Sequence, residues 1–198
     1  MGQTVDKSTF IEGGLHMEDV KSELHIVGIC GSLRENSFNR GLLRAFEQLL
    51  PDKIKFTLAD IAELPFFSEE REHNLPVTVL KLKELVESAD ALIVSTPEYN
   101  LSYTAVLKNA LEWLSRSTLQ RPLAGKPVAV MGAASVQVGV SLSHLRDVMY
   151  ALDVKLINRP IIQVGNAREK FDEKGNLIDS TVKEQLEKLK DELIIVLK

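Results

Sequence analysis

The chain has 198 residues, with 24 basic and 28 acidic side chains and a formal net charge of −4. This composition is typical of one globular domain and excludes a disordered or low-complexity chain. The acidic balance argues against a surface for nucleic acid or anionic membranes. No apolar run approaches the about 20 residues that span a bilayer. The single cysteine, Cys30, excludes an intrachain disulfide and is interpreted as a core residue.

The N-terminal segment is polar and has no helical or strand period. It lacks the basic start and apolar stretch of a secretory signal, so we expect a cytoplasmic protein. We interpret residues 1–16 as a detachable leader, with the pair His16-Met17 as its junction and Met17 as the native start. The whole segment 1–22 is counted as leader and is expected to lie outside the fold. Residues 23–198 are then a single domain.

From residue 24 onward, short apolar runs alternate with longer amphipathic segments. Strands are predicted at 24–30, 53–59, 91–97, 127–133 and, interrupted by a proline, 154–164. Helices are predicted at 41–50, 77–88, 104–115, 140–152 and 180–196, and a surface loop at 61–76. Strands that alternate with helices need crossover connections, so the pattern predicts a three-layer, doubly wound α/β domain with a five-stranded parallel sheet.

In such a sheet, ligands bind beyond the carboxyl ends of the strands. The first strand exit reads GSLRENSFNR (31–40). It offers hydroxyl and amide donors at Ser32, Ser37 and Asn39, a fixed positive charge at Arg34, and the start of a helix. This combination suits a phosphate dianion, and the alternative is a helix-capping cluster with a solvated arginine. Because neither GxGxxG nor GxxxxGK[ST] occurs, a single phosphate fits better than a pyrophosphate.

The second exit, TPEYNLSYT (96–104), follows the clearest strand. Pro97 stiffens the turn, and Glu98, Tyr99 and Asn100 supply an acid, an aromatic ring and an amide. These groups suit a planar heterocycle, and the alternative is a Pro-Glu turn with a packed tyrosine. At the third exit, 132–141, the loop that carries Ser135 gives only a weak signal of a close approach to a ligand.

The sequence contains no metal-ligand spacing and no candidate nucleophile. Its four histidines are scattered, and neither HExxH nor G-x-S-x-G occurs. We therefore predict no metal site and assign no catalytic side chain. The chemistry has to come from a cofactor.

Three of these segments together resemble the NADPH-dependent FMN reductase family. The resemblance rests on GSLRENSFNR, STPEYN and VLKNALEWLSR and extends from about Leu24 to Phe171. It implies a flavodoxin-like fold with strand order 2-1-3-4-5 and FMN as cofactor. The residues that it implies for the FMN phosphate are Ser32, Arg34, Ser37 and Asn39, and those for the isoalloxazine and ribityl groups are Pro97, Glu98, Tyr99 and Asn100. The sequence departs from the family pattern at 102–105 and at 135–139, where Ser135 borders the flavin.

The resemblance also implies an activity. A member of this family passes hydride from NADPH or NADH through FMN to a quinone or a similar electrophile, such as an azo dye, chromate or free flavin, and forms a homodimer or homotetramer. One alternative is a flavodoxin-like electron carrier, which the modest net charge and Arg34 disfavour. The other is a partner-binding module without flavin, which the altered 133–139 loop leaves open.

Overall fold

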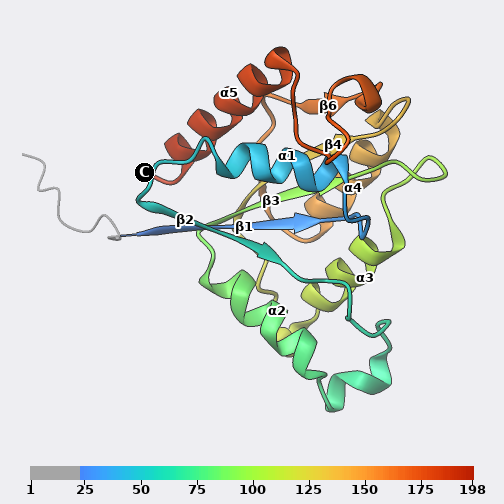
Figure 1. Ribbon diagram of the computed structural model, residues 1–198. Coiled ribbons are helices and arrows are strands. Elements are labelled where there is room, and N and C mark those ends of the chain that lie inside the picture. The colour runs from blue at the N-terminus through green and yellow to red at the C-terminus, as the bar shows by residue number, and fades with distance from the viewer. Residues whose placement is uncertain (1–22) are drawn as a thin grey trace, which may run out of the picture.

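The computed structural model describes residues 23–198, and the predicted leader at 1–22 lies outside the described residues. The described chain forms a parallel sheet between two layers of helices (Figure 1). Its strands are β1 (Leu24–Cys30), β2 (Ile54–Ala59), β3 (Ala91–Thr96), β4 (Pro127–Ala133), β5 (Lys155–Leu156) and β6 (Ile162–Val164). Its α-helices are α1 (Phe38–Glu47), α2 (Val77–Ser88), α3 (Ala105–Leu114), α4 (Gly139–Ala151) and α5 (Ser180–Val196). The strand order β2-β1-β3-β4-β5 confirms the predicted flavodoxin-like topology.

The last predicted strand is divided into two. β5 pairs with the start of β4 at Pro127 and Val128, and β6 pairs with its end from Met131 to Ala133. The cis peptide Arg159–Pro160 lies between the two short strands. Because proline has no N–H to donate, the ladder cannot continue through Pro160.

Each face of the sheet packs against its own helices. α1 and α5 cover one face, and α2, α3 and α4 cover the other (Figure 1). β3 lies at the centre and is buried along its whole length, as its uninterrupted apolar sequence predicts. Because helices cover both faces of the sheet, a site can form only at the ends of the strands, where the loops lie.

α1 begins earlier and ends earlier than the run of apolar residues 41–50 predicts. It starts at Phe38, directly after Ser37, and ends at Glu47. Beyond the C-cap residue, Gln48, the amides of Leu49 and Leu50 donate to the carbonyls three residues back, so the chain tightens into turns. A proline clashes sterically with the residue before it and disfavours a helical conformation there. Pro51 therefore accounts for the early end of α1.

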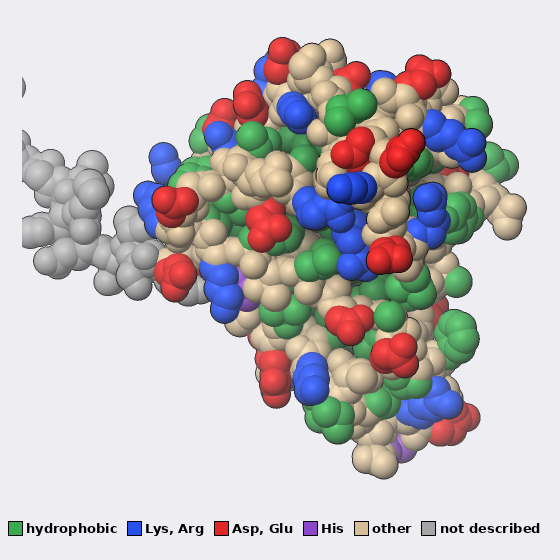
Figure 2. All heavy atoms as spheres, in the orientation of Figure 1, with side chains coloured by type: hydrophobic (Ala, Val, Ile, Leu, Met, Phe, Trp, Pro, Cys, Tyr) green, Lys and Arg blue, Asp and Glu red, His purple; other side chains and the backbone are tan. Residues whose placement is uncertain are grey.

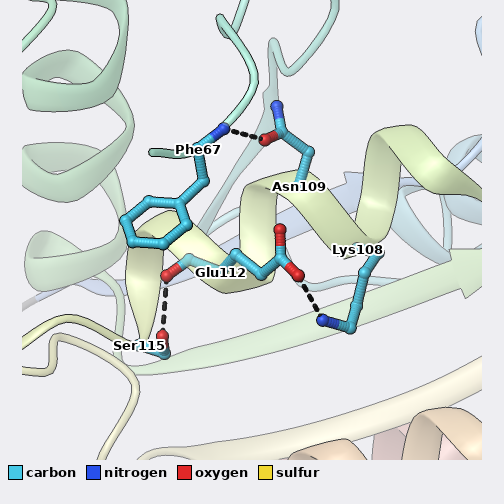
Figure 3. A network of polar contacts seen from close by, with 5 residues as sticks. All are labelled: Phe67, Lys108, Asn109, Glu112 and Ser115. Carbon is cyan, nitrogen blue, oxygen red and sulfur yellow. Dashed lines mark hydrogen bonds and ion pairs between the residues drawn. The ribbon is translucent and has the colours of Figure 1, made fainter. Parts of the chain in front are cut away.

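The connection from β2 to α2 is predicted as a surface loop, and it contains one short 3-10 helix, Glu69–His73. α3 holds this connection in place through Asn109 (Figure 3). The Asn109 side chain accepts a 2.8 Å hydrogen bond from Phe67 N and donates to the carbonyls of Leu64 and Pro65. Trp113 Nε1 donates a further bond to Pro65 O at 2.8 Å. The long connection is therefore fixed on the face of the sheet that carries α3.

Candidate functional site

The exits of β1, β3 and β4 meet in one pocket of about 420 Å³, which we call the central pocket. This volume lies in the usual range for small-molecule and cofactor sites. All nine residues predicted as cofactor contacts line the pocket: Ser32, Arg34, Ser37, Asn39, Pro97, Glu98, Tyr99, Asn100 and Ser135. Six further residues complete it: Phe38, Leu101, Ala133, Ala134, Val136 and Gln137.

The β1–α1 loop brings hydroxyls, a guanidinium and a helix N-terminus to one side of the pocket. Ser37 is the N-cap of α1, and its hydroxyl accepts a bond from Arg40 N at 3.4 Å. Ser32 and Ser37 are both buried. The Arg34 guanidinium lies 5.5 Å from the centre of the Phe38 ring, at the pocket wall. The first turn of α1 has no acidic residue, so the helix dipole and Arg34 together favour an anion here.

Asn39 lies in the pocket wall with both ends of its amide bonded to protein. Its Nδ2 donates to Ala133 O at 2.9 Å, and its Oδ1 accepts from Ala133 N and from Ser95 Oγ, each at 2.9 Å. The side chain is 2% exposed. Asn39 therefore joins α1 to the ends of β3 and β4, and this positioning role was not visible in the sequence.

The β3–α3 loop closes into a two-residue hairpin. The backbones of Tyr99 and Ser102 exchange hydrogen bonds of 2.9 and 3.1 Å, and the two residues between them, Asn100 and Leu101, have φ of 52° and 60°. This left-handed conformation suits asparagine and strains leucine by about 1–2 kcal/mol. The start of α3 is tied to the exit of β1, because Thr104 Oγ1 donates to Gly31 O at 2.6 Å. The hairpin is thus anchored beside the β1–α1 loop.

Glu98 connects the second exit to the third. Its Oε2 accepts a 3.0 Å bond from Ser141 N, in the first turn of α4. The N-cap residue of that helix, Val138, has no side-chain acceptor of its own. Glu98 therefore caps α4 from a different loop, where a carboxylate is favoured by the helix dipole. The sequence identified Glu98 as an acid beside the ligand and missed this bond.

The residues that sequence reasoning missed come mostly from the third exit. Val136 and Gln137 line the pocket next to Ser135, and both are exposed. The departure of 135–139 from the family pattern was the available signal for them. Cys30, predicted as a core residue, is buried, and burial raises the pKa of its thiol above the ordinary value. No group of residues in 23–198 is arranged to hold a metal ion.

The fold is that of a flavodoxin-like domain, and the side chains that line the central pocket suit a phosphate-bearing, planar cofactor. The model of the NADPH-dependent FMN reductase family matches residues 24–169, and the chain belongs to this family. It is 36% identical to an NAD(P)H-dependent FMN reductase of Pseudomonas aeruginosa over 171 residues, 85% of this chain and 92% of the relative. Identity is also 36% over 170 residues with a 2-hydroxy-1,4-benzoquinone reductase of Burkholderia sp, covering 85% of this chain and 93% of that protein.

A solved structure has the same fold. FerB from Paracoccus denitrificans, a flavoenzyme NAD(P)H:(acceptor) oxidoreductase, matches 88% of this chain and 97% of its own, with a TM-score of 0.79 and 27% identity. The chain is thus an NAD(P)H-dependent oxidoreductase with FMN as cofactor, which favours the enzyme over the electron carrier and the partner-binding module. Among residues 23–198, no helix has the length and apolar character that crossing a bilayer requires.

Proposed function

We propose that the protein reduces quinones with NAD(P)H, using FMN bound in the central pocket. The observation that carries this proposal is the convergence of three strand exits on one pocket. The β1–α1 loop, which favours an anion, lies on one side of it, and the Tyr99 hairpin lies on another. The names of the Pseudomonas and Burkholderia relatives support the donor and the acceptor class.

In this proposal, the first loop binds the phosphate end of FMN. Arg34 supplies charge and orientation, and the hydroxyl of Ser32 and the first amides of α1 supply hydrogen bonds. The segment from Pro97 to Asn100, with Ser135, holds the ring and ribityl groups. FMN bound there would supply the hydride chemistry between the nicotinamide and the acceptor, and the hydroquinone product would take its second hydrogen as a proton from solvent. The side chains bind and orient, and none of them is proposed as an acid or base.

The side chains at the mouth of the central pocket suit a flat, apolar acceptor. Tyr99, Leu101 and Val136 line it and are 53%, 60% and 76% exposed. Such exposed apolar groups around a pocket typically mark a binding surface. A quinone ring presents the matching shape and polarity, with oxygens only at its edge.

We further propose that the protein works in the cytoplasm as a homodimer or homotetramer. The cytoplasm supplies the nicotinamide donor, and the family resemblance supports self-association.

The test is a spectrum followed by turnover. We expect the FMN-loaded protein to show oxidised-flavin absorbance bands and to consume one NAD(P)H for each 1,4-benzoquinone reduced. Lys188→Ala, an exposed change on α5 outside the central pocket, should leave both readouts unchanged. Two outcomes would contradict the proposal. A protein that binds FMN and does not oxidise NAD(P)H would be an electron carrier, and a protein that does not bind FMN would be a partner-binding module.

A further inference from the structure

A second polar pocket, of about 330 Å³, opens at the exits of β1 and β2. It is lined by Cys30, Ser32, Leu33, Arg40 and residues 58–62, and we call it the Arg40 pocket. Ser32 lines this pocket and the central pocket as well. The two pockets therefore lie on either side of the segment that follows β1.

Within the part of the chain that the structure describes, the Arg40 guanidinium has no polar partner. Among residues 23–198, its guanidinium makes no hydrogen bond or ion pair, and its Nε is buried without a partner. Arg44, one turn further along α1, is different: its Nη2 donates to Gly175 O at 3.0 Å and to Asn176 Oδ1 at 3.2 Å. A cluster of Lys and Arg side chains lies near the start of α1 on this face of the molecule, with Asp and Glu side chains beside it (Figure 2). Because a buried donor without a partner is costly, Arg40 Nε favours an acceptor that the described residues do not supply, and an anion suits the guanidinium charge.

The acid in the same pocket is already engaged. Asp60 follows β2, and its Oδ1 accepts a 3.0 Å bond from Ala62 N, so it caps its own turn. In dinucleotide-binding α/β sheets, the residues beyond this strand distinguish the two nicotinamide cofactors. An acid there binds the ribose 2′-hydroxyl of NADH, and an arginine nearby accepts the 2′-phosphate of NADPH. Arg40 belongs to α1 and lines the same pocket as the residues that follow β2. Here the arginine, and not the acid, lacks a partner.

We propose that the Arg40 pocket binds a phosphate monoester, and that during turnover this group is the 2′-phosphate of NADPH. The proposal rests on the proposed function, because it places the nicotinamide in the central pocket. β1 lies between β2 and β3, and neighbouring strands are about 4.8 Å apart, so the two pockets are close together. In this proposal the dinucleotide crosses the segment of Ser32 and Leu33, since Ser32 lines both pockets. The protein then prefers NADPH to NADH.

The direct test is equilibrium binding to the FMN-loaded protein, measured by calorimetry. The probes are adenosine 2′,5′-bisphosphate, 5′-AMP and inorganic phosphate. We expect the bisphosphate to bind about ten- to hundredfold more tightly than 5′-AMP, as a charge-assisted contact predicts. Arg40→Gln should abolish this difference and Arg40→Lys should restore part of it. Arg44→Gln, the matched charge change on the same helix, should preserve it.

A kinetic comparison then identifies the source of the phosphate. We expect Arg40→Gln to lower the ratio of kcat/KM for NADPH to that for NADH by the same factor as it lowers bisphosphate binding. Equal losses with both donors, a loss of FMN affinity, or inorganic phosphate that binds as tightly as the bisphosphate would each overturn the assignment. If the wild-type protein oxidised neither donor, the proposed function would fail, while the binding measurement would still decide whether the pocket accepts a phosphate monoester.

Discussion

Replacing Asn39 with leucine should destabilise the protein and loosen the central pocket. Leucine keeps a similar volume but removes the bonds to Ala133 N, Ala133 O and Ser95 Oγ. All of these groups are buried, so water cannot replace the lost partner without a local opening. At about 1 kcal/mol for each of the bonds, the free energy of unfolding should fall by about 3 kcal/mol. For a domain of this size, that corresponds to roughly 6–12 °C in Tm.

Urea unfolding followed by circular dichroism measures this loss, with Ser95→Ala as the matched control. Ser95→Ala removes one bond and leaves the pair between Asn39 and Ala133, so it should cost about 1 kcal/mol. We also expect Asn39→Leu to weaken FMN binding, since the wall formed by α1 and β4 is no longer fixed. A loss for Asn39→Leu no larger than that for Ser95→Ala would refute the positioning role.

Further predictions concern packing, the thiol and kinetics. A change from glycine to alanine normally stabilises a helix, but at Gly41 the new Cβ would lie 2.0 Å from Gly175 O, so we expect Gly41→Ala to lower Tm clearly. Gly139→Ala should be tolerated, because the nearest atom to its new Cβ, Gln163 Oε1, would lie 3.7 Å away. The raised pKa of the Cys30 thiol means that its proton stabilises the fold and that this stability is lost as pH rises above the ordinary thiol pKa; folded protein at about pH 8.5 should therefore resist iodoacetamide until urea unfolds it. Nicotinamide and quinone compete for one exposed flavin face in the proposed site, so a grid of initial rates should give parallel double-reciprocal lines, and intersecting lines would indicate a ternary complex.

The regular elements were predictable because their signals are local. α5 spans the predicted residues 180–196, since Val182, Leu186, Leu189 and Leu193 repeat at helical spacing and are all buried. The prediction of β4 is correct in both bounds for a similar reason, as it is one apolar run. By contrast, the division into β5 and β6 depends on how each segment pairs with β4, and Pro160 alone does not give that pairing.

The site was predictable as a set of residues and not as a set of bonds. Arg34 and the motif that begins at Pro97 come from strand exits whose meeting follows from the topology. The bonds of Asn39 join residues 94 positions apart, and Glu98 caps a helix 43 positions away. That Arg40 Nε finds no partner within residues 23–198 depends likewise on everything that packs around it. Contacts of this range follow only from the three-dimensional arrangement.

Binding of FMN and of riboflavin to the apoprotein tests most directly whether the first loop holds the phosphate. Riboflavin has the same ring and ribityl chain without the phosphate, so titration by flavin fluorescence separates the two ends of the site. We expect wild-type protein to prefer FMN strongly, and Arg34→Ala to weaken FMN binding by about ten- to hundredfold with little effect on riboflavin. This loss should exceed that of any single change from Pro97 to Asn100. Equal losses of FMN and riboflavin in Arg34→Ala, or an unchanged affinity for FMN, would place the phosphate elsewhere and contradict the account.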